Sequence, residues 1–117
     1  MEFEICLNNL VFYAYHGVFP EERKNGNEFL VDLKVNIPYN SVLKGDNLEN
    51  TVSYASLFEI VEDEMSRPRH LLEVLAISII ERIRNKFPLI KGGYISIEKK
   101  QPPIPGMLGS ASVILKF

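Results

Sequence analysis

The chain has 117 residues, of which 46% are hydrophobic and 24% charged, and its formal net charge is −2. This length suits one domain with one core, so we expect a single domain over residues 1–117. A near-neutral charge without a basic cluster argues against nucleic acid as the main partner, and no apolar stretch is long enough to span a bilayer. The first four residues do not open a signal peptide, and Cys6 is the single cysteine, which excludes an internal disulfide. We therefore expect a cytoplasmic protein.

Two strands are predicted in the first third of the chain. Apolar and polar residues alternate over residues 3–7, and the pattern resumes over residues 10–15 after Asn8-Asn9, which predicts one bulged strand. The alternation over residues 29–37 is the most regular in the chain and predicts a half-buried strand. We interpret the polar stretch at residues 17–26 as a long connection between the two strands.

Two helices are predicted in the middle of the chain. Ser53 provides an N-cap for the first helix, and Pro68 ends it. The apolar stripe of this helix comprises Tyr54, Leu57 or Phe58, Val61 and Met65. The second helix begins near Leu71 and ends around Phe87, before Pro88. Its stripe comprises Leu72, Leu75, Ala76, Ile79, Ile80, Ile83 and Phe87.

Two further strands, over residues 94–99 and 111–117, close the chain. The order β-β-α-α-β-β predicts an α+β fold, in which two helices pack on one face of a four-stranded antiparallel sheet.

Lys99 stands out at the end of the third predicted strand. Successive side chains of a strand alternate between its faces, so Lys99 shares the apolar face with Ile95 and Ile97, whereas Lys100 points away. The prolines at residues 102–103 cannot continue the strand, which passes into a rigid loop of the kind that often carries binding and catalytic groups. A lysine on a core-facing row either extends its ammonium to solvent or has a function.

Several other polar residues are candidates with two interpretations. Glu73 lies in the first turn of the second helix, where it either complements the helix dipole or presents an acceptor for two N–H donors of a planar heterocycle. Glu21 and Glu22 are most simply solvated, and Tyr54 most simply packs in the core with a solvated hydroxyl. The histidines and the cysteine lack the spacing of metal ligands, so we expect no metal site.

Part of the second helix has more apolar surface than one core can cover. Leu71, Val74 and Ile77 lie outside its main stripe, so its first half is apolar nearly all round. A four-stranded sheet also has two open edges. Association of identical chains would cover both surfaces, and covering loops would do so equally well.

Four blocks of sequence carry a resemblance to a known family. They are Phe12-Tyr13-Ala14-Tyr15-His16-Gly17 followed by Glu22 and Gly26, Asp46-Asn47 with Thr51-Val52-Ser53-Tyr54, Leu71-Leu72-Glu73-x-Leu75-Ala76, and Lys99-x-Gln101-Pro102-Pro103-Ile104-Pro105-Gly106. In this order and at these separations they closely resemble bacterial dihydroneopterin aldolase, over essentially the whole chain. Two details depart from the family pattern: Gln101 stands where asparagine is frequent, and Pro68-Arg69-His70 is an unusual lead into the third block.

The resemblance implies a tunnelling fold and a reaction of folate biosynthesis. The substrate would be 7,8-dihydroneopterin, whose cleavage between the first and second tail carbons gives 6-hydroxymethyl-7,8-dihydropterin and glycolaldehyde. The C6=N5 imine of the substrate accepts the electrons, so neither a lysine Schiff base nor a metal or other cofactor is required. The resemblance also implies homo-oligomeric rings, tetramers or octamers, with active sites between subunits.

The resemblance further implies a role for each site residue. Glu73 and the Leu72 backbone would bind the pterin edge, and Tyr54 would come from the neighbouring subunit. Lys99 would be the general acid and base, and Glu22 would hold or activate it. Lys99, Glu22 and Tyr54 are therefore the expected catalytic residues, and Glu22, Tyr54, Leu72 and Glu73 the expected substrate contacts.

Two alternatives to the aldolase are kept. One is a dedicated epimerase of dihydroneopterin triphosphate, which shares the fold but lacks the Y-H-G and P-P-I-P-G blocks and would favour a more basic pocket. The other is a non-enzymatic pterin-binding subunit, which would have no use for Lys99. Epimerase activity at the second tail carbon would also accompany the aldolase reaction, since the cleaved fragments can recombine.

Overall fold

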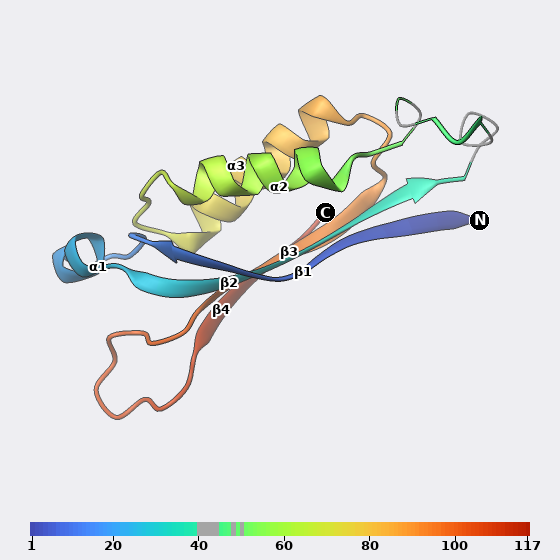
Figure 1. The fold of residues 1–117 in the computed structure, drawn as a ribbon. Coiled ribbons are helices and arrows are strands. Elements are labelled where there is room, and N and C mark those ends of the chain that lie inside the picture. The colour runs from blue at the N-terminus through green and yellow to red at the C-terminus, as the bar shows by residue number, and fades with distance from the viewer. Residues whose placement is uncertain (40–44, 48, 50) are drawn as a thin grey trace.

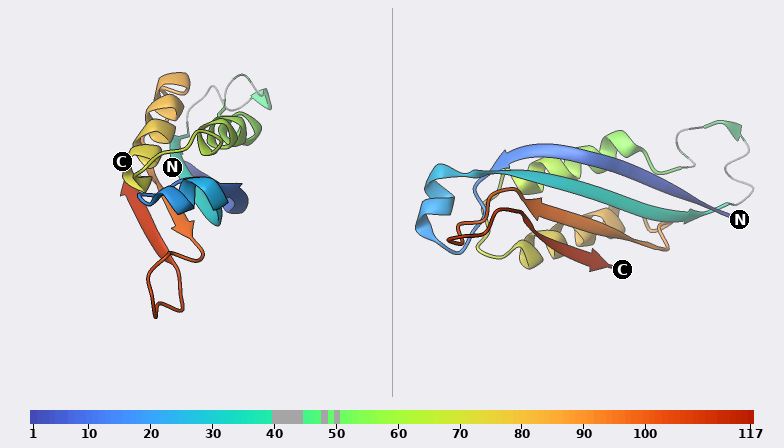
Figure 2. Two further views of the ribbon diagram at one scale, coloured as in Figure 1. Left: turned by 90° about the vertical axis from the view of Figure 1, so that its left-hand side faces the viewer. Right: turned by 90° about the horizontal axis from the view of Figure 1, so that it is seen from below.

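A computed structural model of the chain describes residues 1–39, 45–47, 49 and 51–117. The elements are β1 (Glu2–Ala14), α1 (Pro20–Asn25), β2 (Asn27–Pro38), α2 (Tyr54–Met65), α3 (Leu72–Lys86), β3 (Gly92–Lys99) and β4 (Ala111–Lys116). The strands form one antiparallel sheet in the order β1-β2-β3-β4. Figure 1 shows α2 and α3 lying together on one face of this sheet, and Figure 2 shows the four strands side by side from the opposite face. The predicted α+β class is confirmed.

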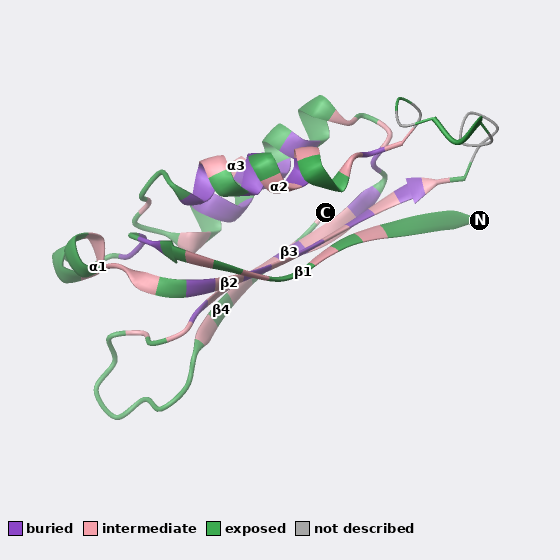
Figure 3. Ribbon diagram, in the orientation of Figure 1, coloured by how far each residue is buried: buried purple, intermediate pink, exposed green. Residues whose placement is uncertain are grey.

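The core lies between the sheet and the two long helices (Figure 3). Alternate residues of β2 point into it, and all five apolar side chains of this row are at most 1% exposed: Phe29, Val31, Leu33, Val35 and Ile37. Full burial of one such side chain contributes about 1.5–3 kcal/mol to folding, so this row is a main source of stability. The most regular alternation in the sequence thus marks the central strand that is buried most completely.

The predicted bulge in β1 is confirmed. The pairing of β1 with β2 shifts register between Leu7 and Leu10, and Asn9 has a left-handed backbone with φ of 54°. The backbone N–H of Asn9 donates a hydrogen bond of 2.8 Å to Oδ1 of Asp32 on β2. The bulge inserts one extra residue, so that Leu10 and Phe12 lie on the same face of β1 as Ile5 and Leu7.

The two long helices follow their predicted bounds, with one error in the stripe of α2. Ser53 caps α2 by accepting a hydrogen bond from the Ser56 N–H, and the buried residues are Leu57, Ile60, Val61, Glu64 and Met65. Tyr54, predicted in the core, is 68% exposed although Leu57 in the same turn is buried, because the first residue of a helix has helical neighbours on one side only. The predicted stripe of α3 is buried at Leu75, Ala76, Ile79, Ile80 and Ile83, and its two end members, Leu72 and Phe87, are half-buried against the core. No helix in the described part of the chain is long and apolar enough to cross a membrane.

The helix α1 corrects the interpretation of residues 17–26 as a connection without secondary structure. Pro20 occupies its first turn, and the Glu22 carboxylate accepts a hydrogen bond of 3.1 Å from the backbone N–H of Phe19. Gly26, with φ of 75°, ends the helix in a conformation that glycine adopts without strain. Six residues are too few for an apolar period, so capping residues were the only available signal.

Candidate active site

Lys99 is the last residue of β3 and lies on the face of the sheet that the helices cover. Its neighbours across the sheet are Phe29 on β2 and Ala111 on β4, and it is 9% exposed. It shares this face with the fully buried Ile95 and Ile97, as strand alternation predicted. The Lys99 ammonium is therefore held in the protein layer at the point where the regular sheet ends.

Glu22 is the partner of Lys99. The Lys99 Nζ donates to Oε1 of Glu22 at 2.6 Å, and both side chains are about nine-tenths buried. Burial raises the pKa of the Glu22 carboxyl, but hydrogen bonds from Lys99 and from the backbone N–H of Phe19 outweigh it and hold this pKa below the ordinary value. Glu22 is therefore a carboxylate at neutral pH. From the residues alone we expected a solvated Glu22, and only the family resemblance implied that Glu22 contacts Lys99.

The Lys99–Glu22 pair lines a cavity of about 260 Å³, which we call the Lys99 cavity. The start of α3 also lines it, with Leu72 and the exposed Glu73. The loop at residues 102–104 and the β4 side chains of Ala111 and Val113 complete it. The cavity thus brings together four of the five predicted site residues from three separate segments of the chain.

Further cavity residues were not predicted as part of a site. They include Val18, Phe19, His70, Ile104 and Val113. The register of β3 with β4 explains one of them, because Val113 pairs with Ile97 and so lies on the same face as Lys99. The rest come from loops, which carry no periodic signal.

Tyr54 does not line the Lys99 cavity of its own chain. It is exposed at the N-terminal end of α2, the end that points away from α1 in Figure 1. Within one chain the structure therefore separates Tyr54 from the other candidates.

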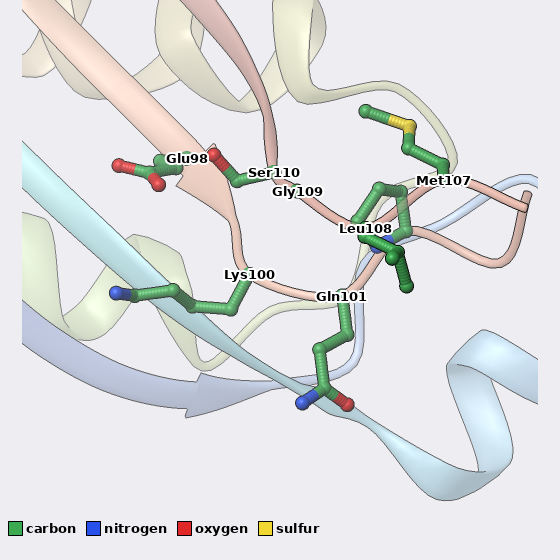
Figure 4. Close-up of a pocket in the computed structure, with 8 residues that line it drawn as sticks. Glu98, Lys100, Gln101, Met107, Leu108, Gly109 and Ser110 are labelled. Atoms are coloured by element: carbon green, nitrogen blue, oxygen red, sulfur yellow. The ribbon is translucent and has the colours of Figure 1, made fainter.

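A larger hollow of about 620 Å³ lies beside Lys100, under the loop that joins β3 to β4. Figure 4 shows its side chains, with Glu98 and Lys100 on the strand side and Met107 and Leu108 on the loop side. It lacks both the Lys99–Glu22 pair and Glu73. We therefore take the smaller Lys99 cavity as the candidate site, because a buried acid–base pair and a second carboxylate line it together.

His16 packs against Phe29, the β2 neighbour of Lys99, and is 1% exposed. Its Nδ1 accepts a hydrogen bond of 3.0 Å from the Arg69 backbone N–H, and its ring packs edge-on against Phe29. Burial, with smaller contributions from the positive charges of Arg69 and Lys99, lowers the pKa of His16 to about 4, against the opposing effect of the Met65 carbonyl. His16 is therefore neutral at neutral pH. No three His, Cys, Asp or Glu side chains of the described residues gather in a group that could hold a metal ion.

The neutral His16 predicts a pH dependence of stability. In the unfolded chain this histidine takes up a proton below its ordinary pKa of 6.5, whereas in the fold it does so only near pH 4. The unfolded state then binds more protons, so the free energy of unfolding is unaffected above about pH 6.5 and falls by about 2–3 kcal/mol between there and pH 4. Denaturant unfolding at a series of pH values measures this loss.

His16→Asn is the matched control for this prediction. An asparagine oxygen can accept the Arg69 N–H in place of Nδ1 but does not titrate. The variant should lose much less stability between pH 6.5 and 4. The same slope in both proteins would show that another group causes the loss.

The chain is similar to one family of known proteins over its whole length. A sequence profile of the FolB family, dihydroneopterin aldolase, matches residues 5–116. The dihydroneopterin aldolase of Bacillus subtilis is 34% identical over 111 residues, which cover 94% of this chain and 92% of that protein. Among solved structures, E. coli dihydroneopterin aldolase in complex with neopterin matches with a TM-score of 0.83 and 19% identity, over 97% of both chains. Dihydroneopterin aldolase of Burkholderia thailendensis bound to guanine matches with a TM-score of 0.77 and 16% identity, over 99% of this chain and 90% of that one.

Proposed function

This chain belongs to the dihydroneopterin aldolase family, and from that premise we propose that it cleaves 7,8-dihydroneopterin with Lys99, Glu22 and Glu73 as its working groups. The products are 6-hydroxymethyl-7,8-dihydropterin and glycolaldehyde. The observation that carries this proposal is that the buried Lys99–Glu22 pair and Glu73 line one cavity. The proposed proton-transfer pair and the proposed ligand-binding carboxylate thus belong to the same site.

Glu73 is the proposed anchor of the pterin ring. Its carboxylate offers two acceptor oxygens, which match the exocyclic amino group and the adjacent ring N–H of a pterin. The Leu72 backbone lies beside it at the start of α3. The E. coli and Burkholderia proteins were solved with neopterin and guanine, respectively, and these two ligands share the same aminopyrimidinone edge.

The proposed reaction is a retro-aldol cleavage. Removal of the proton from the hydroxyl on the second tail carbon turns that carbon into the aldehyde of glycolaldehyde as the bond to the first tail carbon breaks. The bonding electrons move into the C6=N5 imine, and N5 takes up a proton. Protonation of the first tail carbon and loss of the N5 proton then restore the imine in 6-hydroxymethyl-7,8-dihydropterin.

Lys99 is the proposed carrier of these protons, either directly or through water. Its ammonium is held by the Glu22 carboxylate at 2.6 Å, so it is oriented before the substrate binds. Because the substrate supplies its own electron sink, Lys99 forms no covalent bond in this scheme. Orientation and proton transfer are the contributions left to the protein.

We also propose that the working site includes a second copy of the chain. The Lys99 cavity of one chain, about 260 Å³, is slightly below the roughly 300–1,000 Å³ of typical ligand sites. Leu71, Val74 and Ile77 beside it are 45–46% exposed, and β1 and β4 are open sheet edges. A homo-oligomer, tetramer or octamer, would cover these surfaces and bring Tyr54 of one chain to the cavity of the next.

Mixing two inactive variants tests this assembly. If Tyr54 and Glu73 of one site come from different chains, Tyr54→Ala and Glu73→Ala proteins should regain part of the wild-type activity after subunit exchange, because a mixed interface contains one intact site. Turnover before and after exchange measures the recovery. Light scattering should also give a mass well above 13.4 kDa. An active monomer would contradict the shared site.

The function itself is tested by incubating purified protein with 7,8-dihydroneopterin and assaying glycolaldehyde. Stoichiometric release of glycolaldehyde is expected. Inversion at the second tail carbon without release would instead favour the epimerase, and binding without any reaction would favour a pterin-binding subunit.

A further inference from the structure

Arg69 lies shortly before α3 in the chain and is hydrogen-bonded to the segment that leads from β1 to α1. Its backbone is hydrogen-bonded in both directions to the segment that follows β1. The Arg69 N–H donates to Nδ1 of His16 at 3.0 Å, and its carbonyl accepts from the Gly17 N–H at 2.9 Å. Gly17 packs so closely on Glu22 that any side chain at this position would displace the carboxylate. A shift of the Arg69 backbone would therefore move Gly17, and Gly17 would in turn displace the Glu22 carboxylate.

The side chain of Arg69 is also held in place, by contacts with Glu64 on α2 and with the turn that follows α2. Its guanidinium forms an ion pair with the Glu64 carboxylate and donates to the carbonyls of Glu64 and Arg67 at 2.9 and 2.7 Å. Glu64 is 3% exposed, and its second carboxylate oxygen accepts from Arg82 on α3 at 2.8 Å. The buried carboxylate thus connects Arg69 to both long helices.

The charge of Glu64 is stable at neutral pH. Burial raises the pKa of this carboxyl, but hydrogen bonds from Arg82 and Arg69 outweigh burial and hold the pKa below its ordinary value. A buried ion pair of this kind has a defined geometry, since each charge depends on its partner for solvation. Only two residues, His70 and Leu71, separate Arg69 from Leu72, so α3 begins close to a fixed point.

We propose that Arg69 is a positioning residue of the reaction, which sets the separation between Glu73 and the Lys99–Glu22 pair. Arg69 does not line the cavity and touches no reacting atom. It acts on Glu22 through Gly17, and on Glu73 through the start of α3. This inference rests on the proposed function, because the separation matters only if the pterin is held at Glu73 while protons move at Lys99.

The test compares Arg69→Ala with Arg67→Ala, a matched control. Arg67 is close in sequence, but its side chain is 61% exposed and pairs with Asp63 on the surface. Turnover is measured per pterin-binding site, well below the unfolding temperature. We expect kcat per site of Arg69→Ala to fall by about 10- to 100-fold, since a displacement near 1 Å is enough for such a loss, while the pterin Kd changes less than about threefold. Arg67→Ala should retain wild-type values of both.

A merely structural role predicts a different result. It would lower the unfolding temperature of Arg69→Ala and leave kcat per folded site unchanged. A kcat per site within twofold of the wild type, or an equal loss in Arg67→Ala, overturns the proposal. If Arg69→Ala does not fold, Arg69→Lys is measured instead. Lysine keeps the positive charge but lacks the planar guanidinium group with its several N–H donors, so kcat per site should fall by about 3- to 10-fold. An unchanged kcat of this variant also overturns the proposal.

Amide hydrogen exchange separates this inference from the proposed function. Exchange of the Gly17 N–H should become faster in Arg69→Ala or Arg69→Lys than in the wild type, and should be unchanged in Arg67→Ala. Wild-type protein without aldolase activity would refute the proposed function whatever the exchange shows. Unchanged exchange at Gly17 in the Arg69 variants would refute the coupling whatever the activity.

Discussion

Replacing Lys99 by alanine is expected to reduce kcat by about 10²–10⁴-fold, the usual contribution of a general acid and base. Pterin affinity should change little, because the proposed anchor is Glu73, which belongs to α3 and not to the Lys99–Glu22 pair. The decrease should therefore appear in kcat and kcat/KM together, as for an interaction made in the transition state. Steady-state assays of glycolaldehyde release, with a separate pterin titration, measure both quantities.

Lys100→Ala is the matched control, since Lys100 directly follows Lys99 at the end of β3 and lines a different hollow. Lys100 should therefore be dispensable for turnover and for binding (Figure 4). A loss of activity in Lys100→Ala that equals the loss in Lys99→Ala would contradict the assignment. Borohydride added during turnover should also trap no adduct on Lys99, and a covalent adduct there would rule out the proposed mechanism.

Glu73→Gln is expected to weaken pterin binding by roughly 2–4 kcal/mol, about 30- to 800-fold in Kd. The change is isosteric, but it replaces one acceptor oxygen by an NH₂ group that faces a donor of the ligand. A charge-assisted pair of hydrogen bonds then becomes one neutral hydrogen bond and one mismatch. Titration of a fluorescent pterin analogue measures the change.

Glu81→Gln provides the control for this variant. Glu81 is also exposed on α3 but lies farther along the helix and outside the Lys99 cavity. Its substitution should leave the pterin Kd within twofold of the wild type. Equal affinities of the Glu73→Gln variant and the wild-type protein would reduce Glu73 to a helix-start residue that complements the dipole.

Local patterns in the sequence were sufficient for most of the architecture. The bulged strand, the central strand and both long helices follow from periodicities of two and 3.6 residues, which depend only on near neighbours. The same rule decided which of two adjacent lysines faces the helices, because a strand side chain has only two directions available. The α1 helix was not predicted, because its six residues are too few to show a period.

The pairings that make the site could be decided only by the tertiary structure. Glu22 and Lys99 are 77 positions apart, and Arg69 and His16 are 53 apart, so no local pattern relates them. Glu64 illustrates the same limit. A charged residue is not expected on the buried face of α2. Its charge is stable there because Arg69, from the turn after α2, and Arg82, from α3, both pair with it. The periodicity of a sequence predicts which residues are buried. Which polar residues become partners depends on which segments the sheet and helices bring together. The sequence by itself therefore determined the layers of this protein and the direction of Lys99, and the packing of those layers decided which carboxylate meets it.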